Sequence, residues 1–195
     1  MHRVSVTESG HLSDLSGKLI EHLESHSVRT DGPFTLRSGQ VSSWYLDARQ
    51  TTFDGEGAHL VGSAVLEILH ESVTAVGGMT MGADPIAVAT AVVASTRNRP
   101  LRAFSVRKEV KAHGVGGRLV GPISAGDVVA AVDDTITTGG ALIESIEVML
   151  EQGLEVAQAV CVVDRSGGAA EERCAAHGIP FTALVLPADL GVEGP

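Results

Sequence analysis

The feature that most restricts the fold of this chain is the alternation of short apolar runs with stripes of apolar residues at helical spacing. The runs lie at 73–76, 101–106, 128–132, 156–163 and 181–186, and each has the length of a strand. Helical stripes separate most of them. Strands that alternate with helices in this way form parallel sheets. We therefore predict an α/β fold with a central, twisted, mostly parallel sheet and helices on both of its faces.

The first fifty residues follow a different pattern. Apolar residues at helical spacing predict an amphipathic helix over about 11–25. Two short apolar pieces, Phe34–Leu36 and Trp44–Leu46, flank Ser38-Gly39 and predict a small hairpin or hood. Core packing is the favoured interpretation of Trp44, although its place in the hood also allows contact with a ligand.

The length and organisation indicate one domain. A chain of 195 residues with 44% apolar residues can bury a substantial core, and no repeat or linker interrupts it. We expect a single domain over residues 1–195, with about 1–50 as the amino-terminal helix and hood and about 51–195 as the core.

Three local features predict where elements begin and end. Gly77-Gly78 should close the strand that precedes it. Asp84 should cap a helix that has Pro85 in its first position. Gly153 should stop the helix that follows Gly139-Gly140.

The charges are distributed unevenly along the chain. Fourteen basic and 24 acidic residues give a net charge of −10, which argues against general affinity for nucleic acid or an anionic membrane. The segment 97–118 nevertheless contains seven of the 14 basic residues and one acid, Glu109. This basic island predicts a small anionic ligand. Its glycine-rich part, 107–121, should form a long loop, whereas the three arginines of 97–102 also fit a helix end and a strand start.

Neither a membrane anchor nor a disulfide framework is expected. No apolar run approaches the roughly 18 residues of a membrane span. Cys161 and Cys174 show no CxxC spacing, and two thiols cannot form a framework of disulfides. We expect a protein of the reducing cytoplasm.

The strongest functional pattern is the segment from Val128 to Gly140. An apolar strand leads to Asp133 and Asp134, and hydroxyl and glycine residues then lead into a helix. Backbone amides beside small residues can approach a phosphate, and the helix dipole favours its charge. The two carboxylates suit sugar hydroxyls, a hydrated Mg²⁺ ion or a developing positive charge. The alternative is a strand whose last Asp merely caps the next helix.

A second motif gives the pattern a family resemblance. The segment Arg107–Gly114 reads R-K-x-x-K-x-H-G. With the acidic segment, it resembles the type I phosphoribosyltransferases, and among them the orotate phosphoribosyltransferases, whose mobile basic loop has this form. Further matches lie at Phe34–Gly39, Gly82–Pro85 and Val163–Arg165, in the expected order over about residues 34–165.

The resemblance implies an enzyme with the type I phosphoribosyltransferase fold. Such an enzyme transfers ribose 5-phosphate from phosphoribosyl pyrophosphate to orotate, with Mg²⁺ as cofactor, and gives orotidine 5′-phosphate for UMP synthesis. It is also expected to be a homodimer that shares the basic loop across the interface. Two alternatives stay open: a phosphoribosyltransferase for another base, and a regulator that binds phosphoribosyl pyrophosphate without catalysis.

The resemblance also implies roles for the acidic pair and the residues after it. Asp133 and Asp134 would hold the ribose hydroxyls and help place Mg²⁺ through water and pyrophosphate, without a metal ligand assigned directly. The implied 5′-phosphate site consists of Thr135, Ile136, Thr137, Thr138, Gly139, Gly140 and Ala141.

Other matching positions are implied to bind the pyrophosphate and the base. The pyrophosphate would be covered by Arg107, Lys108, Lys111 and His113, with Lys111 and His113 as catalytic residues beside the acidic pair. The base or the rest of the substrate would meet Arg37, Tyr45, Leu46, Thr137 and Arg165. Arg165 would pair its guanidinium with the carboxylate of orotate, a geometry that Lys cannot reproduce.

Two positions depart from the family pattern. Arg37 stands where many relatives have Lys, so the charge is retained. Met81-Gly82 stands where many relatives carry Tyr-Lys. One pyrophosphate contact is therefore expected to be missing, which bears on affinity more than on the type of reaction.

Overall fold

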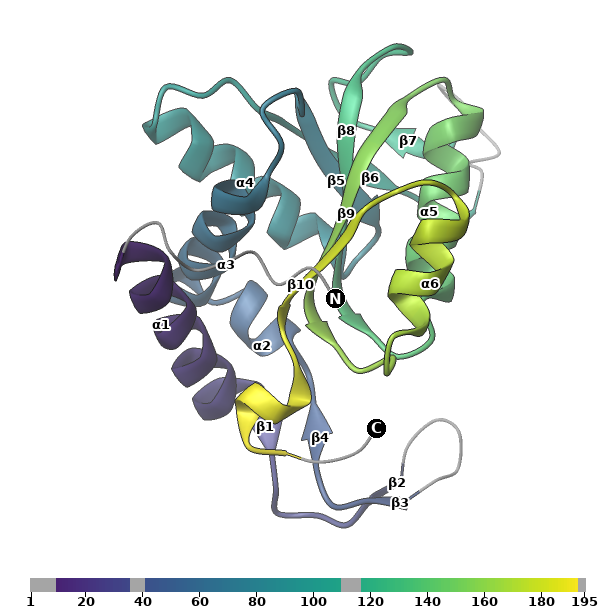
Figure 1. Ribbon diagram of the computed structural model, residues 1–195. Helices are drawn as coiled ribbons and strands as arrows, with labels where there is room; N and C mark the ends of the chain where they lie inside the picture. Colours follow the sequence, from purple (N-terminus) through teal and green to yellow (C-terminus); the bar gives the residue numbers. More distant parts are fainter. Residues whose placement is uncertain (1–9, 36–40, 110–116, 193–195) are drawn as a thin grey trace.

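A six-stranded sheet forms the centre of the computed structural model, which describes residues 10–35, 41–109 and 117–192 (Figure 1). The strands of this sheet are β5 (Ala75–Met79), β6 (Arg102–Val106), β7 (Leu119–Val120), β8 (Val128–Ile136), β9 (Glu155–Asp164) and β10 (Phe181–Val185). Their order is β10-β9-β8-β5-β6-β7, and all neighbours run parallel except β6 and β7. The prediction of an α/β fold with a mostly parallel sheet is confirmed.

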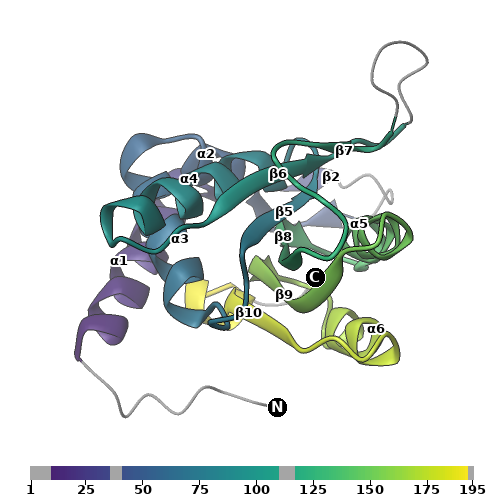
Figure 2. The same ribbon diagram turned by 90° about the horizontal axis from the view of Figure 1, so that it is seen from above.

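Helices cover both faces of the sheet (Figures 1 and 2). The pair on one face is α3 (Gly55–Ile68) and α4 (Ala83–Thr96), and the pair on the other is α5 (Gly140–Glu151) and α6 (Ala169–Ala176). Successive side chains of a strand point to opposite faces. Accordingly, Ala130 and Val132 of β8 belong to the core beneath α3 and α4, while Val129 and Ala131 belong to the core beneath α5. The central strands are therefore buried on both sides.

The amino-terminal part forms a helix and a hood, as predicted. Its elements are α1 (Gly10–His26), β1 (Val28–Arg29), β2 (Phe34–Thr35), β3 (Val41–Ser42), β4 (Tyr45–Leu46) and α2 (Arg49–Thr52). Helix α1 packs against α3, and the short 3₁₀ helix η1 (Pro187–Leu190) returns to α1. The hood, the described part of residues 28–46, consists of two antiparallel pairs, β1 with β4 and β2 with β3.

The glycine pair in β5 corrects one prediction. Gly77 and Gly78 do not close the strand but lie inside it. A Cβ atom on Gly77 would lie 2.5 Å from the Phe104 carbonyl oxygen, and one on Gly78 would lie 2.0 Å from the Val132 carbonyl oxygen. Close approach of the neighbouring strands therefore requires glycine at both positions.

The start of α4 corrects a second prediction. The helix begins at Ala83 with Gly82 as its N-cap, so Asp84 is not the capping residue. The Asp84 carboxylate instead accepts hydrogen bonds from Thr80 Oγ1 at 2.7 Å and Ser105 Oγ at 2.6 Å. Asp84 thus ties the end of β5 to β6. By contrast, Gly153 follows the end of α5 with φ +79°, as expected.

Two boundaries near the acidic segment also differ from expectation. Strand β8 does not end at Val132 but continues to Ile136, because residues 133–136 stay paired with β9. The expected long loop 107–121 contains β7, which runs antiparallel to β6. Both differences extend regular structure further toward the carboxyl end of the sheet.

Candidate active site

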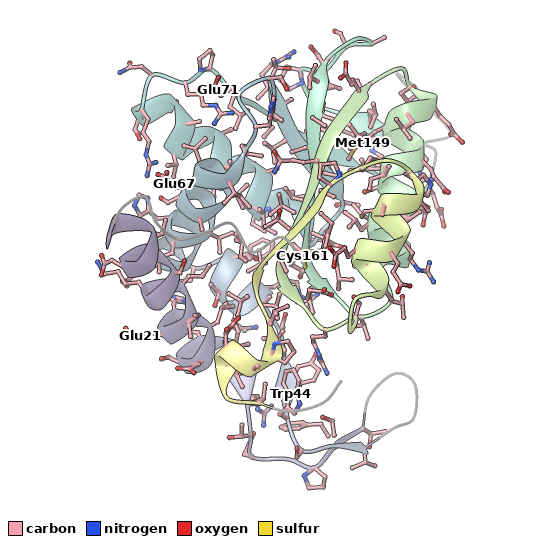
Figure 3. All side chains as sticks on the ribbon, viewed as in Figure 1. Glu21, Trp44, Glu67, Glu71, Met149 and Cys161 are labelled. Carbon is pink, nitrogen blue, oxygen red and sulfur yellow. The ribbon has the colours of Figure 1, made fainter. Side chains whose placement is uncertain are left out.

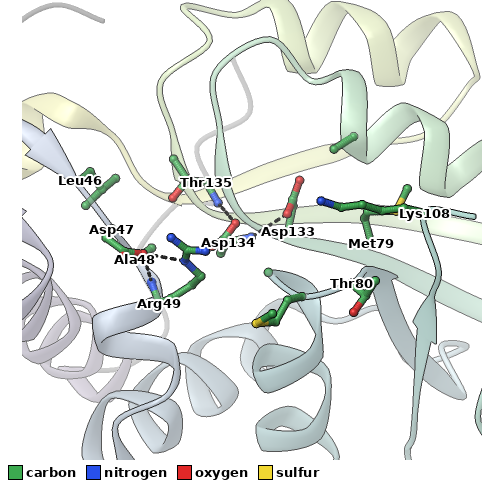
Figure 4. Close-up of a pocket in the computed structure, with 13 residues that line it drawn as sticks. Leu46, Asp47, Ala48, Arg49, Met79, Thr80, Lys108, Asp133, Asp134 and Thr135 are labelled. Carbon is green, nitrogen blue, oxygen red and sulfur yellow. Dashed lines mark hydrogen bonds and ion pairs between the residues drawn. The ribbon is translucent and has the colours of Figure 1, made fainter. Parts of the chain in front are cut away.

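A cleft of about 390 Å³ lies at the carboxyl ends of β5 and β8, where the hood meets the sheet (Figure 4). Its walls come from Leu46 to Arg49, from Met79 to Gly82, from Asp133 to Thr135, and from the single residues Lys108 and Ala141. Ligands of open α/β sheets bind at this end of the strands. The predicted location of the site is the location of the cleft.

The acidic pair forms the floor of the cleft. The Asp133 side chain is buried, with 8% of its residue surface exposed, and burial together with the neighbouring charge of Asp134 raises its pKa to about 7. Burial also raises the pKa of Asp134, against the opposing effects of the Thr135 N–H and the Arg49 charge. Asp134 Oδ1 accepts a hydrogen bond from the Thr135 N–H at 2.7 Å. Cations or hydroxyl donors entering the cleft would therefore favour ionisation of the pair.

The segment after β8 has the features expected of an anion site. Thr137 and Thr138 are exposed, and Gly139 adopts the left-handed conformation with φ +79° at the N-cap of α5. No side chain in the described ranges caps α5, so its first amide groups stay available for an anion. Ile136 is only 2% exposed and its side chain belongs to the core, so any contact that it makes with a phosphate would come from its backbone.

The hood brings two predicted residues near the site in different ways. Leu46 lines the cleft, whereas the partly exposed Tyr45 faces Phe34, with ring centroids 5.8 Å apart. Arg165 follows β9, and its Cζ lies 4.0 Å from the centroid of the Trp44 ring. Neither Tyr45 nor Arg165 lines the cleft itself.

The basic island divides into two parts. Lys108 lines the cleft, and the Arg107 N–H donates to the Arg118 carbonyl at 2.7 Å at the base of the loop. Arg97 pairs with Glu67, Arg99 donates to the His70 carbonyl, and Arg102 pairs with Asp127. These three arginines therefore act in the fold, which was the alternative left open for them. Arg37, Lys111 and His113 lie outside the described residues.

Sequence reasoning missed two groups of residues in the cleft. Arg49 Nε donates to Asp47 Oδ1 at 2.7 Å, and Figure 4 shows Arg49 and Lys108 on opposite sides of the acidic pair. An acid and an arginine two residues apart just after a short strand was the available signal. Residues 79–82 form a second wall, with a cis peptide bond between Thr80 and Met81. A Cβ atom on Gly82 would lie 2.6 Å from Asp134 Oδ1, so a larger residue there would require the Asp134 carboxylate to move.

The donor set bears on the expected Mg²⁺. No group of three or more His, Cys, Asp or Glu residues in the described ranges could hold a metal ion. Asp133 and Asp134 provide two adjacent carboxylates with raised pKa. Because Mg²⁺ keeps several waters and commonly binds one or two carboxylates plus substrate phosphates, this pair fits a hydrated ion.

Within the described ranges, no helix is long and apolar enough to cross a membrane.

Comparisons with known proteins assign the family. The model of the phosphoribosyl transferase domain matches residues 57–179. An orotate phosphoribosyltransferase from Streptomyces avermitilis is 41% identical over 183 residues, which cover 93% of this chain and 100% of the relative. A solved orotate phosphoribosyltransferase from Mycobacterium tuberculosis, in complex with Fe(III) dicitrate, is 35% identical with a TM-score of 0.79, covering 91% of this chain and 99% of that one.

A further structure of the Mycobacterium tuberculosis enzyme is a complex with 5-phospho-α-D-ribosyl 1-diphosphate. It is 32% identical with a TM-score of 0.74, and it covers 91% of this chain and 99% of that chain. The family model spans more than half of the chain, and these relatives match nearly all of it. The chain therefore belongs to the phosphoribosyltransferase family and, within it, to the orotate phosphoribosyltransferases.

Proposed function

We propose that this protein transfers ribose 5-phosphate from phosphoribosyl pyrophosphate to orotate, giving orotidine 5′-phosphate and pyrophosphate for UMP synthesis. The observation that carries the proposal is that the acidic pair Asp133–Asp134 and the start of α5 border the same cleft. No described side chain caps this start of α5. The complex of the Mycobacterium tuberculosis relative with the activated sugar supports this substrate. The names of the relatives favour orotate over another base, and an enzyme over a regulator.

The charges around the cleft suit this chemistry. Transfer of a glycosyl group gives the anomeric carbon oxocarbenium character, which a nearby carboxylate stabilises. The departing pyrophosphate is a polyanion, and Lys108 lies across the cleft from Arg49 where cations can neutralise it. In the proposal, Lys111 and His113 add to this charge from the basic loop, with His113 as a proton donor. One well-placed donor of this kind contributes about 3 kcal/mol to transition-state binding.

The proposal includes a hydrated Mg²⁺ ion held by Asp133, Asp134 and the pyrophosphate. When bound, the ion supplies positive charge to the leaving phosphates. The protein residues orient the ribose through Asp133 and Asp134, while Thr137, Thr138 and the amide groups of α5 hold the 5′-phosphate. The basic loop excludes water, which would otherwise take the sugar.

A homodimer in the cytoplasm is also part of the proposal. Phe53, Met81, Val88 and Val92 expose more than half of their surfaces. A hollow of about 340 Å³ includes Phe53, Val88 and Val92 among its lining residues. A second copy that covered this apolar face would bring its own residues close to the site, because Met81 lines the cleft as well. Sedimentation of the unmodified chain as a monomer would contradict the dimer, and Val88→Asp should dissociate it.

A direct assay tests the activity. Protein, Mg²⁺, phosphoribosyl pyrophosphate and orotate are mixed, and the loss of orotate absorbance is followed. Turnover should require all four components. If orotate is not consumed at high protein concentration while the activated sugar still binds, the regulator becomes the better interpretation. Consumption of another base in place of orotate would favour the other alternative.

A further inference from the structure

Half of the few aromatic residues of the chain lie in the hood. The sequence contains six of them, and Phe34, Trp44 and Tyr45 lie within twelve positions of each other. Trp44 is the single tryptophan, and only 2% of its surface is exposed (Figure 3). A large aromatic side chain is therefore buried at the end of the hood nearest the sheet, where it can contact residues that follow the strands.

The Trp44 ring contacts the guanidinium of Arg165. Arg165 Cζ lies 4.0 Å from the ring centroid, within the range of a cation–π interaction. The Arg165 backbone is fixed independently, because its N–H donates to the Ile136 carbonyl at 2.7 Å. The sheet thus fixes the backbone of Arg165, and the hood contacts its guanidinium.

The contact leaves the two edges of the guanidinium in different situations. Arg165 Nε is buried and has no hydrogen-bond partner among the described residues. The terminal nitrogens are not buried in this way, and they make no hydrogen bond to a described residue. A ligand can therefore reach the terminal edge and not the Nε edge. Two parallel N–H groups on that edge match the two oxygens of a carboxylate.

We propose that Trp44 is a positioning residue that fixes the guanidinium plane of Arg165, so that its terminal nitrogens receive the carboxylate of a planar anionic base. This inference rests on the proposed function. It assigns selection of a carboxylated base to a contact between the hood and the sheet. Trp44 itself need not touch the base.

Kinetics of matched variants test the proposal. Trp44→Leu removes the aromatic face and should raise KM for orotate about tenfold, while KM for phosphoribosyl pyrophosphate changes less than about twofold. Trp44→Phe keeps an aromatic face and should restore most of the affinity for orotate. Phe104→Leu, in a buried aromatic position of β6, should lower the melting temperature without changing KM for orotate. Uracil, which lacks the carboxylate, should react equally slowly with all of these proteins.

Fluorescence gives a second test that needs no substitution of Trp44. Because the chain has one tryptophan, its emission reports on the surroundings of Trp44, which include the Arg165 guanidinium. Binding of orotidine 5′-phosphate should change the emission of the unmodified protein. In Arg165→Lys, which keeps the charge and loses the planar fork, this change should largely disappear. This measurement tests the proposal even if Trp44→Leu does not fold.

The outcomes separate the inference from the function on which it rests. Absence of orotate turnover by the unmodified protein would overturn both. Normal turnover with an unchanged KM for orotate in Trp44→Leu would overturn the inference alone. Equal losses in Trp44→Phe and Trp44→Leu, or a parallel rise in KM for the activated sugar, would also overturn it, since both results indicate general damage to the hood.

Discussion

Strand β8 has a carboxylate near each end, and the two are in opposite electrostatic situations. Just before the strand, Asp127 accepts hydrogen bonds from Arg102 at 2.7 and 3.0 Å, and this pairing holds the pKa of Asp127 below its usual range. Near the other end, Asp133 is buried beside Asp134, and its pKa is raised to about 7. A carboxylate that pairs with a cation stabilises the fold, whereas a carboxylate that is buried beside another one stays available to a ligand.

The same contrast extends across the two edges of the sheet. At the amino edge, the buried Gln158 accepts from the His70 N–H at 2.7 Å and donates to the Ile68 carbonyl at 3.2 Å, which satisfies the end of α3. At the carboxyl edge, Lys108 is exposed and α5 has no side-chain cap. Gln158 therefore serves the fold, whereas Lys108 and the first amide groups of α5 have no side-chain partner among the described residues. The predictions below test this division.

The largest effect is expected at the acidic pair. Asp133→Asn keeps an oxygen for the Asp134 N–H, which lies 3.0 Å from Asp133 Oδ1, but removes the charge that is proposed to face the ribose. We expect kcat/KM for phosphoribosyl pyrophosphate to fall about 100- to 1,000-fold. Steady-state kinetics measures this loss. Glu155→Gln, an exposed acid at the start of β9, should leave the activity unchanged.

The same substitution should stabilise the fold. Because the folded pKa of Asp133 is raised from 3.8 to about 7, its ionisation opposes folding. The stability contributed by the neutral form is complete below pH 3.8 and is lost as the pH rises through 7. Asp133→Asn should therefore be more stable than the unmodified protein at pH 8, by about 1–3 kcal/mol, with the difference vanishing near pH 4. Lower stability at pH 8 in chemical denaturation would contradict the division of the two edges.

The next effect belongs to the structural edge. Gln158→Leu leaves the His70 N–H and the Ile68 carbonyl without their partner and should lower the free energy of unfolding by about 1–3 kcal/mol. Gln158→Glu keeps the acceptor for the His70 N–H but places a buried carboxylate against the Ile68 carbonyl, so it should lose at least as much. Denaturant titration measures both changes. Activity below the melting transition should be normal, and a large fall in kcat for Gln158→Leu would show that the edges are not independent.

The sequence predicts the layers and the acidic site because both depend on local patterns. Apolar periodicity gives the strands and helices, and the run from Val128 to Gly140 gives the strand, the carboxylates and the anion site in order. Contacts between distant segments cannot be predicted from local patterns. In the sequence, Gly77 indicates the end of a strand. Its place inside β5 is explained only by the Phe104 carbonyl, which lies against it in the fold. The contact of Trp44 with Arg165 joins parts of the chain too far apart for any local pattern.

The basic island shows the same limit within one segment. Its composition predicts an anionic ligand, yet Arg97, Arg99 and Arg102 are held by groups of α3 and of the segment before β8. Charge alone cannot separate these roles, because a partner from another segment decides which arginines are available. Arg49 was missed for the corresponding reason, since it lines the cleft with Asp133 and Asp134, which are far from it in the sequence.

A smaller effect is expected at the cation that lines the cleft. Lys108→Ala should raise KM for phosphoribosyl pyrophosphate about tenfold, because it removes one of the two cations that flank the acidic pair among the described residues. Arg97→Ala provides the matched control, since it removes a basic residue of the same island that pairs with Glu67. Initial rates at varied sugar concentration measure the change. Equal effects of the two substitutions would indicate that the net charge of the island matters and not its position.

The smallest effect concerns how Arg49 adjusts the acidic pair. Its charge opposes the rise in the pKa of Asp134, and it also pairs with Asp47. Removing it in Arg49→Met should raise the pKa of the acidic pair further, both by losing a cation and by leaving Asp47 uncompensated. If the ionised pair binds the sugar, kcat/KM rises with pH through about 7, and this limb should move to higher pH by less than about one unit. Arg49→Lys keeps the charge and should preserve the profile. A shift to lower pH would mean that Arg49 does not act on the acidic pair through its charge.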